Sequence, residues 1–241
     1  GYAHAQNRLG HHYEMALSVH QDYQKAFDWY QQAADQGLAE AEYNLGGLYY
    51  LGHGVNQDYA KAFKWFNKAA NQAFASAQYS LVVMYYNGQG VPKSNRKAIE
   101  WLKKAASLGH AEAQYNLGTL YYEGQTVKQD YGKAVEWFSQ AANLGYAEAQ
   151  YNLGICYSNG QGVKQDYNEA FRWFKAAAEQ GYEEAQCNLG VCYYNGKGAN
   201  QDDNEAFRWF KAAAEQGYAG AQCNLGNCYY FGRGVKQDYN E

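Results

Sequence analysis

Five cysteines and six histidines are the side chains of this 241-residue chain that could bind a metal or act as nucleophiles. Two cysteine pairs share a C-x4-C spacing, Cys187 with Cys192 and Cys223 with Cys228, while Cys156 stands alone. Thiolates are good zinc ligands, so the repeated pair suggests a zinc site. On a helix, however, residues i and i+5 diverge by about 140°, which separates the two thiols and also prevents a disulfide within one helix. We therefore predict reduced thiols in small core or groove positions.

The histidines offer little more. His4 and His11 share one face of a predicted first helix, beside His12, so a shared metal contact is conceivable there. No Ser/His/Asp or Cys/His arrangement stands out, and the carboxylates are spread along the chain as on a solvated surface. We predict no catalytic residue, no metal and no cofactor. An enzyme hypothesis would depend on His4 and His11, and loss of an activity on mutating them would be its test.

Composition excludes further classes. The net charge of −4, from 20 basic and 24 acidic residues, gives no electrostatic reason to expect nucleic-acid binding. The apolar runs are too short to span a bilayer. A hydrophobic content of 47% is enough for a packed core, so disorder is not expected.

One unit of 36 residues recurs without insertion or deletion along the whole chain. A fixed period of this length is typical of a solenoid, in which each unit buries its apolar face against its neighbours. We therefore predict one continuous all-α array over residues 1–241, with positions numbered 1 to 36 within each unit. The units are 1–36, 37–72, 73–108, 109–144, 145–180, 181–216 and a partial seventh, 217–241.

The unit predicts two helices. Ala at position 5, Leu at 9 and Tyr at 13 occur in every copy, and this i, i+4, i+8 spacing places them on one stripe of a helix A over positions 3–14. Gly at position 16 would end helix A in a left-handed cap. Asp at position 22, or Ser94 in the third unit, would begin a helix B as its N-cap. Positions 26, 29, 30 and 33 then form the apolar stripe of helix B.

Three recurring residues need their own interpretation. Gly fills position 10 in six units, although glycine weakens a helix by about 1 kcal/mol, so we expect a neighbouring group too close for a side chain. Gly-x-Gly at positions 16–18 suits a tight turn better than a phosphate loop, because no strand precedes it. Trp fills position 29 six times; it is either a core residue between helix B and the next helix A or one of a row of stacking platforms.

The pattern A-x-A-x-x-x-L-G-x-x-Y, then G-x-G-V-x-x-D-x-x-K/E-A-x-x-W-x-x-x-A-A-x-x-G, resembles the Sel-1-like repeat, a relative of the tetratricopeptide repeat. The resemblance covers essentially the whole chain. It implies an α/α right-handed superhelical solenoid, with A helices lining a concave groove and B helices outside, and the role of an adaptor that holds a protein or peptide. Some secreted members carry a disulfide in every repeat, but no cysteine pair here occupies those positions. Local departures from the pattern are Ala16, Ser18, Val82, Asn95 and Thr126.

The face of helix A opposite the Ala–Leu–Tyr stripe holds positions 4, 7, 8, 11, 14 and 15. In the related tetratricopeptide arrangement this face lines the groove, and here it gathers tyrosine, asparagine and glutamate. Tyrosine is enriched at binding hot spots, and asparagine can both donate to and accept from an extended backbone. The predicted groove residues are Tyr43, Tyr50, Tyr79, Tyr86, Tyr115, Tyr122, Tyr151, Tyr194, Tyr230, Asn44, Asn116, Asn152, Asn188 and Asn224, rimmed by Glu40, Glu112, Glu148 and Glu184.

Two interpretations of these tyrosines stay open and are compatible: they bind a partner, or they stack from unit to unit and stiffen the array. We expect a scaffold that presents the groove to a protein or peptide. The alternative is a structural protein that self-associates end to end into a filament, because no polar capping unit is visible in the sequence.

Overall fold

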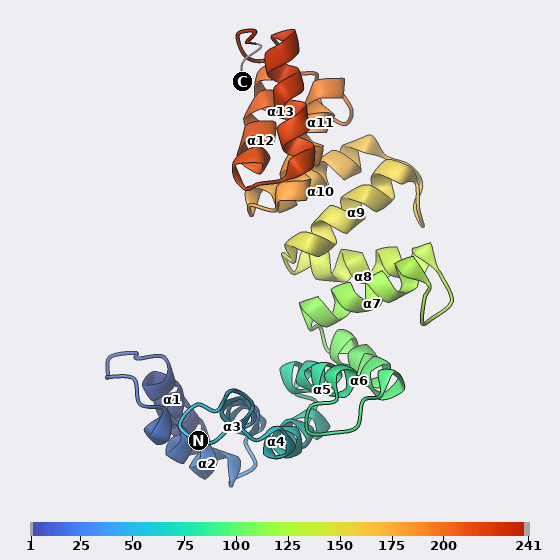
Figure 1. Ribbon diagram of the computed structural model, residues 1–241. Coiled ribbons are helices and arrows are strands. Elements are labelled where there is room, and N and C mark those ends of the chain that lie inside the picture. The colour runs from blue at the N-terminus through green and yellow to red at the C-terminus, as the bar shows by residue number, and fades with distance from the viewer. Residues whose placement is uncertain (1, 239–241) are drawn as a thin grey trace. The chain divides into compact units, whose positions relative to one another are not determined.

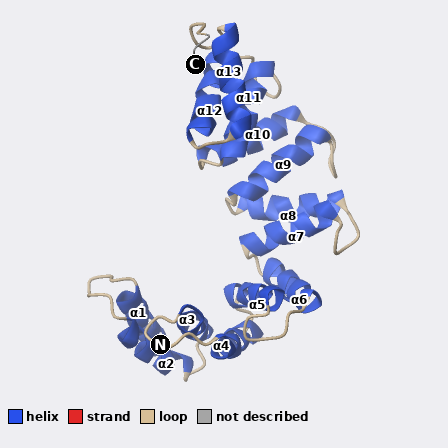
Figure 2. Cartoon of the chain, viewed as in Figure 1, coloured by secondary structure: helices blue, strands red, loops and turns tan. Residues whose placement is uncertain are grey.

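The computed structural model describes residues 2–238, and within them it contains 13 α-helices and no strand (Figures 1 and 2). The all-α repeat predicted from the period is confirmed. Gly1 and the helix B predicted after Asp238 lie outside the described residues. The A helices are α1 (Tyr2–Glu14), α3 (Ala39–Leu51), α5 (Ala75–Asn87), α7 (Ala111–Glu123), α9 (Ala147–Asn159), α11 (Glu183–Asn195) and α13 (Ala219–Phe231). The B helices are α2 (Tyr23–Ala34), α4 (Tyr59–Asn71), α6 (Asn95–Ser107), α8 (Tyr131–Asn143), α10 (Tyr167–Glu179) and α12 (Asp203–Glu215).

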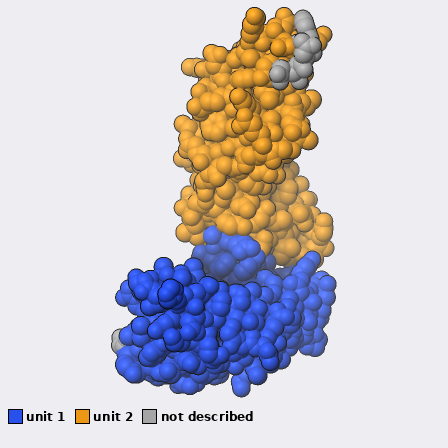
Figure 3. Space-filling view, turned by 60° about the vertical axis from the view of Figure 1, so that its left-hand side comes forward, with its two compact units in different colours: residues 1–113 blue, residues 114–241 orange. Residues whose placement is uncertain are grey.

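The chain divides into two compact units, residues 1–113 and 114–241 (Figure 3). In the first, successive helices in the series α1 to α6 pack against each other, ending with α5 against α6. In the second, the same is true from α8 to α13. Within each unit, a repeat therefore buries its apolar stripes against the repeats beside it, as a solenoid requires.

The helix ends follow the predicted signals. Asp58 has extended backbone angles, and its side chain accepts a hydrogen bond from the backbone N–H of Lys61. Ser94 caps α6 in the same way through the N–H of Lys97. Helix A ends on a left-handed glycine, as at Gly52 with φ 74°. These caps satisfy backbone groups that a helix end would otherwise leave without partners.

The expected close approach at position 10 is confirmed, and the approaching group is the ring at position 30 of the same repeat. A Cβ on Gly46 would lie 2.7 Å from the ring of Phe66, and one on Gly154 would lie 2.6 Å from that of Phe174. The third repeat carries a different pair, Val82 and Leu102. Helices A and B therefore touch through an aromatic ring laid on a bare helix backbone.

The tryptophans at position 29 differ from the expectation. Trp65 is half-buried and packs against the core of α2 and α3, the helices before it, rather than against the helix A that follows. The fully buried residue of this turn is its neighbour Phe66, 4% exposed. The outer face of the Trp65 indole is covered by Lys68, whose Nζ lies 3.9 Å from the ring centroid. Trp65 therefore lies at the edge of the hydrophobic core formed by α2 and α3, and it covers that core from solvent.

A buried polar side chain at position 6 links three helices. Gln150 is 7% exposed; its amide donates to the backbone carbonyl of Ala142 in the preceding helix B, at 3.1 Å. Its own carbonyl oxygen accepts a bond of 2.8 Å from Gln180, at the end of the following helix B. Gln186 repeats the arrangement in the next repeat. Glu42 occupies this position in the second repeat.

Candidate functional site

We call positions 4, 7, 8, 11, 14 and 15 of the A helices the A-helix face. Of the predicted groove tyrosines, two are well exposed: Tyr86 at 59% and Tyr230 at 56%. The others, like the predicted asparagines, are half-buried. Side chains in this state still present part of their surface to solvent, so a partner could reach them.

Tyrosines at position 7 lie between two other rings. The Tyr43 ring centroid is 5.6 Å from that of Phe66 in its own repeat and 5.2 Å from that of Phe74 in the next. Tyr151 contacts Phe174 and Tyr182 in the same way, at 6.0 and 5.3 Å. Position 2, which sequence reasoning left out, therefore belongs to this surface. Its signal was present, because the residues there are mostly aromatic: Tyr2, Phe74, His110, Tyr146, Tyr182 and Tyr218.

Tyrosines at position 14 connect successive repeats. The hydroxyl of Tyr50 donates to Oε1 of Gln89 at 2.9 Å, and its ring meets that of Tyr59 edge-on at 5.2 Å. Tyr122 makes the same bond of 2.9 Å to Gln161. Part of each side chain thus stabilises the stack, while part stays open to solvent.

The asparagines at position 8 are partly used inside the protein. The amide of Asn44 donates to Oδ1 of Asn7 at 3.0 Å, and that of Asn152 donates to the backbone carbonyl of Glu148 at 3.0 Å. Asn224 approaches the thiol of Cys187 at 3.5 Å. These three amides therefore already make hydrogen bonds within the protein. The tyrosines contribute more of the exposed side-chain surface that a partner could contact.

A pocket of about 220 Å³ opens on the A-helix face in the first unit. Its lining is mainly aromatic and apolar, and it includes Ser80 where most other repeats have the larger asparagine. The lining residues are Tyr50, Phe66, Tyr79, Ser80 and Val83. A hollow with these walls suits one apolar side chain of a bound segment.

Tyr79, on the wall of this pocket, is fixed by two residues at the start of the next repeat. Its ring stacks on that of His110, with centroids 4.6 Å apart and planes 20° apart. Its hydroxyl donates to Oε1 of Glu112 at 2.6 Å. Burial lowers the pKa of His110, and nearby Glu112 opposes that shift. The site is therefore an aromatic wall with a carboxylate at its edge.

The five cysteines lie in α9, α11 and α13. All five are free; Cys223 is exposed and the other four are buried. Burial raises the pKa of Cys156 and of Cys192 to about 11, which disfavours their nucleophilic thiolate form. Within residues 2–238 no group of three or more His, Cys, Asp or Glu side chains is placed to hold a metal ion. No described helix is long and apolar enough to cross a membrane.

This difference in exposure predicts how the thiols react. In the native protein a thiol reagent such as DTNB should modify one cysteine, Cys223, rapidly, and the other four only on unfolding. Absorbance at 412 nm measures the number of thiols that react in the native protein and, with guanidinium present, the number that react in the unfolded protein. The Cys223→Ser variant should lose the fast phase. Fast reaction of a second thiol in that variant would contradict the burial of the remaining four.

Comparison with known proteins gives consistent results. The family model of the Sel1 repeat matches seven times, at residues 3–38, 39–74, 75–110, 111–146, 147–182, 183–218 and 219–241. A protective antigen of uropathogenic Escherichia coli, described as displaying an SLR fold, is 38% identical with a TM-score of 0.89. The match covers 100% of this chain and 51% of the antigen, so this chain spans about half its length.

Two further solved structures are similar. A Sel1 repeat protein from Oxalobacter formigenes is 32% identical over 97% of this chain and 92% of its own, with a TM-score of 0.81. An immunity protein from Pseudomonas aeruginosa, 23% identical over 91% of this chain and 83% of its own, shares the fold with a TM-score of 0.52. No curated protein matches the chain.

Proposed function

The chain belongs to the Sel1 repeat family, and on that premise we propose that it is a scaffold that binds a protein or peptide partner along the A-helix face. The Tyr50–Tyr79 pocket carries the proposal most directly, because it is an apolar hollow on the face that gathers the tyrosines. Tyrosine supplies large contact area at low entropic cost, and such residues dominate binding energies at interfaces.

Packing and binding can share these side chains. Tyr79 is held by His110 and Glu112 at one edge, so it needs no further ordering when a partner arrives. A surface ordered in advance binds more tightly, because less conformational entropy is lost on association. The contacts between repeats therefore support the proposed function rather than compete with it.

The first test fills the pocket and keeps the tyrosines that stabilise the stack, and a second test removes tyrosines. Ser80→Arg places a long side chain in the pocket, and Ala60→Arg adds the same group to an exposed position of α4 as the matched control. Partners would be captured with the wild-type chain and identified by mass spectrometry. The affinity of each purified partner would then be measured by calorimetry.

We expect Ser80→Arg, and separately Tyr→Ala at Tyr79, Tyr115 and Tyr151, to weaken binding by about 10-fold or more. Ala60→Arg should leave the affinity unchanged. Circular dichroism would confirm that each variant is folded. A partner whose affinity is the same for Ser80→Arg and the wild type, or lower only for Ala60→Arg, would contradict the proposal.

A further inference from the structure

Charge is divided unequally between the two sets of helices. The sequences of α3, α5, α7, α9, α11 and α13 contain no lysine or arginine. Every B helix from α2 to α12 contains at least one. Four of these A helices carry glutamate instead, with Glu40, Glu112, Glu148 and Glu184 at position 4 of the A-helix face, while α5 and α13 carry none. From the second repeat onward, a partner of positive charge would therefore meet this face without a repelling side chain, whereas α1 carries Arg8 at position 8.

The glutamates stand beside aromatic rings. Glu112 accepts the hydroxyl of Tyr79 at 2.6 Å, next to His110. In the second unit Glu184 lies close enough to Tyr151 and Tyr182 to help burial raise the pKa of both. An aromatic ring with a carboxylate beside it attracts a cation in two ways. The ring quadrupole attracts the cation to the ring face, and the negative charge of the carboxylate attracts it to the edge.

One oxygen atom of these carboxylates lacks a hydrogen-bond donor within the described part of the chain. Oε2 of Glu184 is shielded from solvent and accepts no hydrogen bond there. Buried oxygens are nearly always paired, because an unpaired one forfeits its hydration without return. The negative charge of this half-buried carboxylate is therefore not offset by a donor at Oε2, and it would attract a cation bound beside it.

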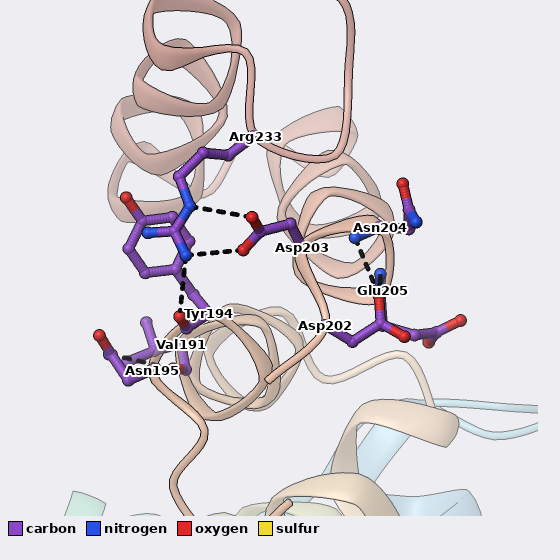
Figure 4. Close-up of polar contacts among 8 residues, drawn as sticks. All are labelled: Val191, Tyr194, Asn195, Asp202, Asp203, Asn204, Glu205 and Arg233. Atoms are coloured by element: carbon purple, nitrogen blue, oxygen red, sulfur yellow. Dashed lines mark hydrogen bonds and ion pairs between the residues drawn. The ribbon is translucent and has the colours of Figure 1, made fainter. Parts of the chain in front are cut away.

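The protein already holds one arginine by the same chemistry. Arg233 lies with its guanidinium carbon 3.6 Å from the ring centroid of Tyr194, a tyrosine of the A-helix face. Its Nε and Nη2 donate to the two carboxylate oxygens of Asp203 at 3.1 and 2.7 Å, and Nη2 also donates to the Tyr194 carbonyl at 3.3 Å (Figure 4). A tyrosine and a carboxylate of this scaffold therefore bind a guanidinium from both its face and its edge.

From these observations we infer that the segment bound on the A-helix face carries arginine, set between a tyrosine ring and the carboxylate of Glu112 or Glu184. This inference rests on the proposed function. Arginine fits better than lysine, because its guanidinium group is planar. Its face can stack on a tyrosine ring while the N–H groups along its edge donate to a carboxylate. In the first unit, the 220 Å³ pocket is lined by Tyr79, the tyrosine bonded to Glu112, and it would take an apolar side chain of a segment bound there.

A random dodecapeptide phage library tests the inference. Selections would use the wild-type chain, the Glu112→Gln/Glu184→Gln double variant, and Glu136→Gln as the control, since Glu136 is exposed on α8. We expect arginine to be enriched among peptides bound to the wild type and to Glu136→Gln, and to fall to the library frequency with the double variant. One selected peptide would then be made with citrulline, the neutral isostere of arginine. Its affinity for the wild type should fall by about 10-fold.

The outcomes separate the two proposals. Peptides without arginine that bind the wild type and are lost with Ser80→Arg would overturn the inference and leave the A-helix face as the binding site. Arginine enrichment that persists in the double variant would also overturn it, because net charge alone would then explain the preference. Selected peptides that bind Ser80→Arg and the Tyr→Ala variant unchanged, or no enrichment of any peptide, would contradict both proposals.

Discussion

Replacing Gly154 by valine should lower the free energy of unfolding by about 1–3 kcal/mol, the usual cost of forcing extra carbon atoms into a filled core. Helix propensity alone predicts the opposite sign, because glycine is the weaker helix former. Packing wins because the first added carbon would already lie 2.6 Å from the ring of Phe174. Denaturant unfolding followed at 222 nm measures the change.

The third repeat indicates how the loss could be repaired. It has Val82 and Leu102 at the two positions, and Leu102 is buried, at 4% exposure. Gly154→Val combined with Phe174→Leu should therefore recover more than half of the stability lost by Gly154→Val. A double-mutant cycle reports this coupling.

Gly226 provides the matched control for the valine substitution. It has the same Asn-Leu-Gly context, yet a Cβ there would meet nothing within 4 Å among the described residues. Gly226→Val should change stability by no more than about 0.5 kcal/mol. Equal losses at Gly154 and Gly226, or additive effects in the cycle, would contradict the ring-on-backbone contact.

The same contact shows what a sequence can and cannot specify. Recurrence of glycine at position 10 predicted a close approach, because nothing else explains a helix-weakening residue kept in register. The approaching group could not be identified, since Trp65 and Phe66 both lie on the apolar stripe of helix B. Only the placement of α4 on α3 decides that Phe66 enters the core and Trp65 covers its edge.

Two sets of positions escaped sequence reasoning for different reasons. Glutamine at position 6 reads as a surface residue because buried glutamine is uncommon, and its partners Ala142 and Gln180 come from other helices. Aromatic residues at position 2, such as Tyr182, precede helix A and so fall outside a helical wheel. Both sets recur in register, and this recurrence was the signal available.

For the candidate site, the faces of helix A could be separated from the 100° turn per residue alone. The position of the pocket could not, because it depends on one small side chain, Ser80, standing among three rings from two repeats. The sequence alone shows that lysine and arginine are concentrated in the B helices. The structure adds that tyrosines and glutamates of the A helices lie side by side, as Tyr79 and Glu112 do.

Replacing Glu42 by glutamine should stabilise the protein by about 1–2 kcal/mol at pH 7, within the cost of leaving a buried polar group poorly paired. Glu42 is 4% exposed and accepts one hydrogen bond of 2.8 Å from Gln72. Glutamines at this position in four other repeats also donate to the backbone carbonyl of residue 34 of the preceding repeat: Gln78, Gln150, Gln186 and Gln222. An ionised carboxylate has no proton to donate to Ala34. Glutamine restores the donor without changing the shape.

The pH dependence gives the prediction its sign. Burial raises the pKa of Glu42, against the opposing effects of the Gln72 bond and the charge of Lys68. A carboxyl group whose folded pKa exceeds its unfolded value of about 4.3 binds more protons when folded. The wild type therefore keeps this contribution below the unfolded pKa and loses it as pH rises through the folded pKa. The advantage of Glu42→Gln should be small near pH 4, grow above it, and then level off.

Denaturant unfolding of the wild type and of Glu42→Gln across pH 4–8 measures the difference between their free energies of unfolding. Titrations of other groups affect both proteins equally, so they cancel from this difference. Glu136→Gln, at an exposed position of α8, should differ from the wild type by no more than about 0.5 kcal/mol. A Glu42→Gln variant less stable than the wild type at pH 7 would show that the bond from Gln72 to a charged acceptor outweighs the missing donor. Because Glu42 is the one position-6 residue in this chain that titrates, either result would assign a measurable pH response to a single side chain of the repeat array.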